Sequence, residues 1–118
     1  MDILYINKEK ILCNFEELSN VWDTSTNISL HLDIQIPDFE LIVTELLKKP
    51  LNDLAYSILA EIAEKNGLDE RLMRLIYEQE DKACKVAICL RNDLPIDLKV
   101  KCAHSDDADI REHYFKML

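Results

Sequence analysis

The chain has 118 residues, a length that supports one domain with a hydrophobic core of its own. Hydrophobic residues make up 48% of it and charged residues 31%, which argues against a disordered chain. The net charge of −9 argues against nucleic-acid binding, because phosphate contacts need clustered lysine and arginine. No apolar run reaches the roughly 18–20 residues of a membrane span, and no signal peptide is apparent. We therefore expect a cytoplasmic protein that contacts neither nucleic acid nor membrane.

The first 36 residues predict a helix and a short β element. Asn7 can cap a helix over residues 8–22, where apolar side chains recur at helical spacing. Residues 28–36 alternate strictly between apolar and polar side chains, which predicts a strand with one face in solvent. Because a lone strand is unstable, we expect it to pair with residues 2–6. The polar side chains expected on its solvent face are Ser29, His31, Asp33 and Gln35.

From residue 37 onward the apolar period is helical. Pro37 suits the first turn of a helix that Pro50 closes. Asn52 can cap the next helix, for which Gly67, the only glycine, supplies the stop. Four further short helices are expected over residues 69–79, 81–91, 95–103 and 107–117.

The C-terminal part of the chain repeats itself at an offset of 26 residues. The matching pairs are Asn66 and Asn92, Leu68 and Leu94, Leu72 and Leu98, Asp81 and Asp107, Cys84 and Ile110, and Lys85 and Arg111. A looser copy lies upstream, with Phe39, Leu41 and Leu54. Tandem helix pairs that bury a common core by stacking are typical of a solenoid. The expected core positions are Leu72, Leu75, Cys84, Ala87, Leu98 and Ile110.

The segment LMRLIYEQEDKACKVAICLRNDLPIDL resembles a variant leucine-rich, HEAT-like helical repeat. In that family paired leucines precede an acidic turn, a hydrophobic–basic pair, and an Asn and a Pro that open the next unit. The matching positions are Leu72 and Leu75, Glu80 and Asp81, Cys84 and Lys85, and Asn92 and Pro95. The resemblance implies a mostly α fold of stacked helix pairs, a HEAT-like α-solenoid, with a small N-terminal β element. We expect a single domain over residues 1–118, with the helix and β element in 1–36 and the repeats in 37–118.

The stretch HSDDADIREH, residues 104–113, collects acidic side chains between two histidines. Its acids stand where a helix begins, and carboxylates there cap free amides. A calcium loop would need a central glycine and a closing glutamate, and the nine-residue spacing of His104 and His113 does not suit a helical metal pair. We interpret the stretch as a capped turn. A partner-facing acidic patch is the alternative.

Neither the cysteines nor any other motif predicts catalysis. The four cysteines form no Cys-x-x-Cys pair, and no two sit at zinc-ligand spacing with a histidine, so we interpret them as small buried side chains in a reducing compartment. The sequence has no glycine-bounded nucleophile and no phosphate-binding loop. We therefore expect a non-enzymatic protein with no cofactor and no metal. The cysteines are Cys13, Cys84, Cys89 and Cys102.

The negative charge is concentrated in the N-terminal part. Residues 1–47 hold nine acids against two lysines, a balance of −7, and the remaining residues hold fourteen acids and twelve bases, a balance of −2. An acidic surface attracts basic proteins, although it also serves solubility. Partner-binding side chains are expected where these acids accompany the single tryptophan, which can instead close the core at a helix end. The expected partner-binding residues are Trp22, Asp23, His31, Asp33, Asp38 and Glu40.

In class, size and charge the chain resembles the bacterial immunity proteins of contact-dependent growth inhibition and related polymorphic toxin systems. That resemblance implies an inhibitor that binds a basic toxin domain, a nuclease, and blocks its active site. The alternative is a non-catalytic helical-repeat adaptor or scaffold for a basic protein or peptide. A structural subunit of a larger assembly is a further alternative, against which the absence of a long linker argues.

Overall fold

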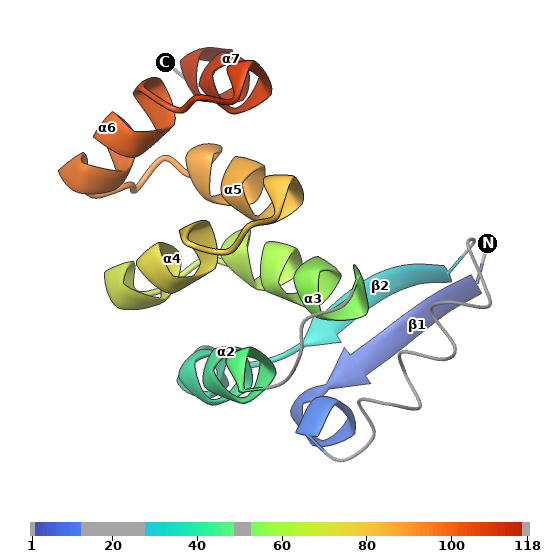
Figure 1. The fold of residues 1–118 in the computed structure, drawn as a ribbon. Coiled ribbons are helices and arrows are strands. Elements are labelled where there is room, and N and C mark those ends of the chain that lie inside the picture. The colour runs from blue at the N-terminus through green and yellow to red at the C-terminus, as the bar shows by residue number, and fades with distance from the viewer. Residues whose placement is uncertain (1, 13–27, 49–52, 117–118) are drawn as a thin grey trace. The chain divides into compact units, whose positions relative to one another are not determined.

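The computed structural model describes residues 2–12, 28–48 and 53–116 of the chain, which divides into two units, Met1–Ile58 and Leu59–Leu118. Within the described residues the protein is mostly helical and has one small two-stranded sheet near the N-terminus (Figure 1). The prediction of a mostly α fold with a small N-terminal β element is therefore confirmed.

The sheet consists of β1 (Asp2–Asn7) and β2 (Ile28–Asp33), which run parallel. Parallel strands need a crossover of about a dozen residues or more, commonly a helix. Here the crossover begins with the helical residues 8–12, and the Asn7 side chain accepts a hydrogen bond of 2.9 Å from the Lys10 amide. The strand pairing and the Asn7 cap are both confirmed. The rest of the predicted helix, residues 13–22, lies outside the described residues.

Where burial is described, the alternation predicted for residues 28–36 holds from His31 to Gln35, two residues beyond the end of the strand. Leu32 and Ile34 are buried as expected. The alternation also predicts that Ile36 is buried, and this prediction is wrong because its side chain is largely exposed. The strand ends at Asp33, and Ile36 opens the short 3-10 helix η1 (Ile36–Asp38), where the two-residue period no longer applies. The confirmed solvent-facing side chains are His31, Asp33 and Gln35.

Two helices follow, and each has a buried apolar face. Pro37 lies in the first turn of η1, which leads directly into α2 (Phe39–Leu47). The next helix is α3 (Asp53–Ala63), and the division between the two units falls within it. Beyond α3, Gly67 adopts a positive φ of 84°, as its predicted role as a stop requires. The fully buried side chains of these helices include Ile42, Val43, Leu54, Ile58, Leu59 and Ile62.

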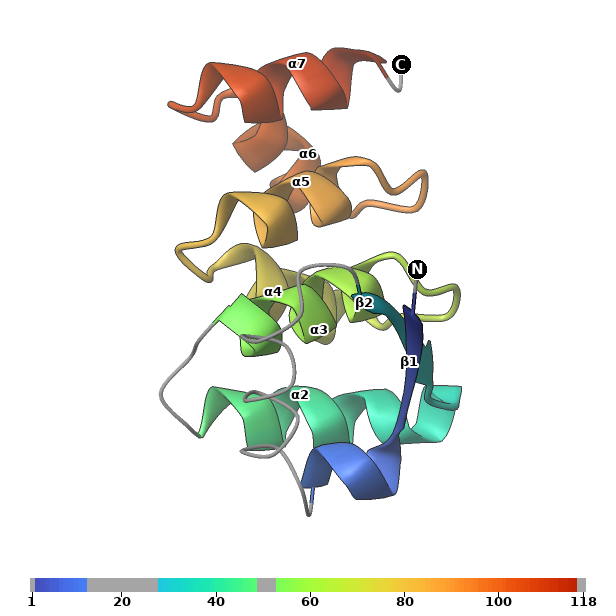
Figure 2. The same ribbon diagram turned by 90° about the vertical axis from the view of Figure 1, so that its right-hand side faces the viewer.

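The C-terminal unit continues with four short helices, each close to its predicted range (Figure 2). Asp69 and Asp81 each stand at the N-terminus of a helix, and each side chain accepts a 3.0 Å hydrogen bond from the amide three residues on. These caps satisfy amides that the first helical turn leaves without partners. The helices are α4 (Glu70–Tyr77), α5 (Lys82–Cys89), α6 (Ile96–Ala103) and α7 (Ala108–Lys116).

The six residue pairs named above for the 26-residue offset have matching burial. Five of the six predicted core positions are buried, namely Leu72, Cys84, Ala87, Leu98 and Ile110. The prediction is wrong for Leu75, which is only half-buried. The buried stripe of α4 runs through Leu72, Met73, Ile76 and Tyr77, and at 100° per residue Leu75 falls on its flank.

No helix in the described part of the chain is long and apolar enough to cross a bilayer.

Candidate partner-binding surface

The parallel register places four polar and aromatic side chains together on the outer face of the sheet. Tyr5 lies opposite His31, and Asn7 lies opposite Asp33. The rings of Tyr5 and His31 stack with centroids 5.3 Å apart and an interplanar angle of 24°. Tyr5 is nevertheless 62% exposed, and His31 and Asp33 are exposed as well. We call these four residues, Tyr5, Asn7, His31 and Asp33, the sheet-face site.

The sheet-face site lines an open pocket within the N-terminal unit. Lys10 borders this pocket, and its ammonium donates to the carbonyl of Tyr5 at 3.4 Å. The site thus combines a stacked aromatic pair with a carboxylate, an amide and a neighbouring ammonium group. Such a surface can contact a protein partner through apolar rings and charge-assisted hydrogen bonds together.

The other predicted binding residues lie elsewhere. The carboxylate of Asp38 pairs with the Lys8 ammonium at 3.0 Å and is partly buried, so part of its charge is neutralised within the fold. Glu40 is exposed in the first turn of α2. Trp22 and Asp23 lie outside the described residues. Tyr5 was missed by the sequence reasoning, although its position one residue from the buried Ile6 would have placed it on the outer face.

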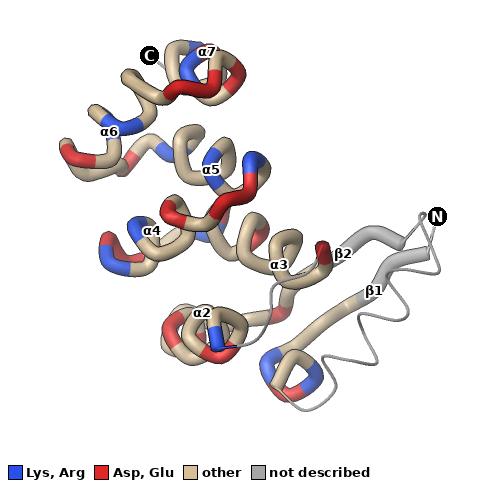
Figure 3. The backbone as a smooth tube through the Cα atoms, in the orientation of Figure 1, with Lys and Arg blue, Asp and Glu red and all other residues tan. Residues whose placement is uncertain are grey.

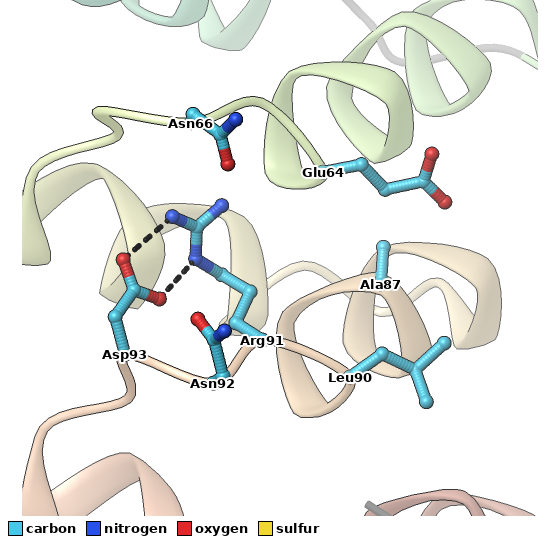
Figure 4. A pocket seen from close by; sticks show the side chains of 7 residues that line it. All are labelled: Glu64, Asn66, Ala87, Leu90, Arg91, Asn92 and Asp93. Atoms are coloured by element: carbon cyan, nitrogen blue, oxygen red, sulfur yellow. Dashed lines mark hydrogen bonds and ion pairs between the residues drawn. The ribbon is translucent and has the colours of Figure 1, made fainter.

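A second open pocket lies in the C-terminal unit beside Arg91 (Figure 4). The guanidinium of Arg91 donates to both carboxylate oxygens of Asp93, at 2.8 and 2.9 Å, and to the carbonyls of Ala63 and Lys65 at 2.6 and 2.8 Å. Only 7% of its side chain is exposed. The hydrogen bonds that the Asp93 carboxylate accepts from Arg91 hold the pKa of that carboxyl below its usual value. Arg91 therefore fastens the chain after α3 to the turn after α5.

The acidic stretch 104–113 is largely engaged within the fold. Asp107 accepts a hydrogen bond of 2.9 Å from the Asp109 amide, as predicted for a capped turn. The Lys82 ammonium of α5 pairs with both carboxylates and lowers the pKa of the Asp109 carboxyl. Arg111 donates to the carbonyl of Ser105. Among residues 2–12, 28–48 and 53–116, no group of three His, Cys, Asp or Glu side chains is arranged to hold a metal ion.

Acidic residues nevertheless mark two equivalent turns of the C-terminal unit, α4–α5 and α6–α7 (Figure 3). We call their exposed carboxylates, those of Glu78, Glu80 and Asp106, the acidic turns. Glu80 and Asp106 are matched by the 26-residue offset. Because neighbouring carboxylates attract positively charged groups, the acidic turns are a second candidate contact surface.

The interpretation of the cysteines is partly wrong. Cys84, Cys89 and Cys102 are fully buried as expected, but Cys89 of α5 and Cys102 of α6 form a disulfide with Cα atoms 6.0 Å apart. No sequence motif marks this pair, because the two cysteines lie 13 residues apart on different helices. Disulfides persist mainly in oxidising compartments, so the bond argues against the reducing compartment that we expected. Cys13 lies outside the described residues.

Cys84 is expected to resist alkylation in the folded protein. Burial, reinforced by the nearby Asp81 carboxylate, raises the pKa of its thiol to about 12, so the reactive thiolate is scarce at neutral pH. Labelling with iodoacetamide, followed by peptide mass spectrometry, should modify Cys84 only after urea unfolding. Rapid modification under native conditions would show that α5 opens or that the thiol is accessible.

Comparison with known protein families, with curated proteins and with solved structures finds no match for this chain. The function is therefore inferred from its residues and their arrangement.

Proposed function

We propose that this chain is a non-catalytic inhibitor that binds a basic toxin domain, a nuclease, and blocks its active site. The proposal rests on one observation, the exposed aromatic pair beside a carboxylate in the sheet-face site. Interface centres are enriched in aromatic side chains that become fully desolvated on binding, and Tyr5 stacked on His31 offers such an anchor in exposed form. Asp33 beside it supplies a carboxylate for a partner's lysine or arginine.

The strand arrangement supports a partner at this face. Parallel sheets are normally covered on both faces. In this sheet Ile6 and Leu32 are buried on one side, whereas Tyr5 and His31 are exposed on the other. A protein that packed against the outer face would complete the arrangement that parallel strands usually have.

Charge supports a basic partner. Residues 1–47 carry a balance of −7, which steers a positively charged domain toward the unit that holds the sheet-face site. A nuclease cleft is shaped to receive phosphates and is therefore attractive to carboxylates. Masking such a cleft requires no catalytic group on the inhibitor.

We also propose that the C-terminal helix pairs stack as a HEAT-like α-solenoid. Equivalent side chains are buried in both pairs, and ion pairs join successive pairs through Arg74 with Asp97 and Lys82 with Asp109. The inhibitor would act in the cytoplasm, where Cys89 and Cys102 would be reduced. The relevant stability is then that of the protein with this disulfide open.

The alternative proposal is an adaptor that binds a basic peptide along the acidic turns. It is favoured by the matching positions of Glu80 and Asp106 on the equivalent turns α4–α5 and α6–α7. The two proposals differ in the contact surface, so paired variants distinguish them.

The double change Tyr5→Ala and His31→Ala is expected to weaken the complex with the toxin domain at least about tenfold, because an interface anchor is lost.

The gene for that toxin is expected directly upstream of the gene for this chain. The isolated toxin domain should arrest bacterial growth, and co-expression of the wild-type chain should restore growth. Binding kinetics in low and physiological salt should show slower association at higher salt, since steering acts over about one Debye length, ~8–10 Å.

The matched control is the double change Glu80→Gln and Asp106→Asn in the acidic turns. It should lower the affinity for the toxin domain less than the sheet-face variant does. Circular dichroism should show all variants folded. If the acidic-turn variant abolished binding while the sheet-face variant bound normally, the adaptor proposal would replace the first. Absence of both binding and growth rescue by the wild-type chain would end the immunity proposal.

A further inference from the structure

The turn between α3 and α4 contains the pair Asn66–Gly67, which belongs to neither candidate contact surface. Both residues are exposed, and Gly67 has a φ of 84°, in the left-handed region that favours glycine. In the part of the chain that the structure describes, neither the Asn66 side chain nor the Gly67 amide has a hydrogen-bond partner. The Gly67 nitrogen and the Asn66 carboxamide are thus adjacent in the chain and accessible to water.

An asparagine followed by a glycine can modify itself without an enzyme. The backbone nitrogen of the glycine attacks the side-chain carbonyl carbon, Cγ, of the asparagine, and a bond forms between these two atoms. The bond from Cγ to the carboxamide nitrogen breaks, and ammonia leaves with the proton that the backbone nitrogen has lost. Water then opens the resulting succinimide ring to aspartate or isoaspartate. Neither an oxidant nor a reductant takes part.

The 26-residue offset supplies an internal comparison for this reaction. Asn92 is the equivalent of Asn66, is exposed as well, and lines the same pocket beside Arg91 (Figure 4). The residue after it is Asp93, whose carboxylate accepts two hydrogen bonds from Arg91. Glycine lets a backbone nitrogen approach a neighbouring group closely, whereas the Cβ of an aspartate hinders that approach. Asn92 should therefore react much more slowly than Asn66.

We propose that Asn66 is a site of spontaneous deamidation in the folded protein, and that the reaction weakens the hold of Arg91 on the α3–α4 turn. The Arg91 guanidinium donates to the carbonyls of Ala63 and Lys65, at 2.6 and 2.8 Å, directly before Asn66. Isoaspartate routes the backbone through the former side chain and so adds a methylene group to the chain at this turn. The added length displaces the carbonyls from the guanidinium.

The test is incubation of the folded full chain in mildly alkaline buffer, followed by acidic digestion and peptide mass spectrometry. The peptide that contains Asn66 should gain the mass difference between an amide and an acid. It should do so at least about tenfold faster than the peptide that contains Asn92, which corresponds to about 1.4 kcal/mol of activation free energy. The rate should rise with pH, because the attacking amide must lose its proton.

Two substitutions act on the two reacting groups. Asn66→Gln should abolish the modification, because the longer side chain closes a larger ring much more slowly. Gly67→Ala should slow it at least about tenfold, by the same activation free energy of about 1.4 kcal/mol. Because a Cβ is unfavourable at the positive φ of Gly67, circular dichroism should verify that this variant folds. The comparison of the two asparagines within the wild type needs no substitution. An Asn66 that stays unmodified, or that reacts no faster than Asn92, overturns the proposal.

The effect on the contact of Arg91 is measured on the modified molecules themselves. They carry one more negative charge, so anion exchange separates them from the unmodified protein. Urea denaturation of this fraction should give a lower midpoint than that of fresh protein. The matched control is Asn66→Asp, which carries the new carboxylate on a backbone of normal length and should keep a midpoint close to that of the wild type. An isoaspartate fraction with the wild-type midpoint would overturn the link to Arg91.

Discussion

Replacement of Leu72 by alanine is expected to lower the free energy of unfolding by about 2–5 kcal/mol. Leu72 is only 2% exposed and lies on the buried stripe of α4. Its removal takes away both the transfer free energy of the side chain and the packing contacts around the cavity that remains. The measurement is urea denaturation followed by circular dichroism, where the midpoint should fall and the slope should stay the same.

Leu90→Ala provides the matched control, because this leucine is 36% exposed at the end of α5. Leu90→Ala should lower the free energy of unfolding by well under half as much as Leu72→Ala does, because the Leu90 side chain is only partly buried. Leu98→Ala, at the equivalent position of the next pair, should resemble Leu72→Ala because Leu98 is fully buried. A loss of stability for Leu72→Ala no larger than for Leu90→Ala would contradict the repeat register.

Opening of the Cys89–Cys102 disulfide is expected to lower the free energy of unfolding by about 3 kcal/mol, the chain-entropy value for so short a loop. The two cysteines lie 13 residues apart, on α5 and α6. The bond restricts the unfolded chain, and its loss lets the unfolded ensemble expand. The measurement is urea denaturation of the wild type with and without a dithiol reductant.

The control for this experiment is the double variant Cys89→Ala with Cys102→Ala. Reductant should destabilise the wild type but leave the double variant unchanged, since its remaining described cysteine, Cys84, is a buried thiol outside the disulfide. The proposed cytoplasmic role further requires that the reduced protein be folded at growth temperature. If it is unfolded there, the inhibitor must act in an oxidising compartment.

The sequence by itself determined features that depend on neighbouring residues. The Asn7 cap, the approximate ranges of the helices from α2 to α7 and the two N-terminal strands follow from local periodicity and capping, and these are present in the described residues. The exposed positions of His31 and Asp33 followed from the same alternation. The predictions failed for Ile36, where the period changes, and for Leu75, where the choice between adjacent faces of α4 depends on what packs against it.

The tertiary structure decided what depends on which elements meet. The stacking of Tyr5 on His31 required the parallel register of two strands more than 20 residues apart in sequence. The packing of α5 against its neighbours brings Cys89 and Cys102 together in a disulfide. It also places Arg91 where its guanidinium donates to the carbonyls of Ala63 and Lys65. Composition and periodicity carry no signal for such pairs, because residues distant in sequence become partners only when the chain has folded.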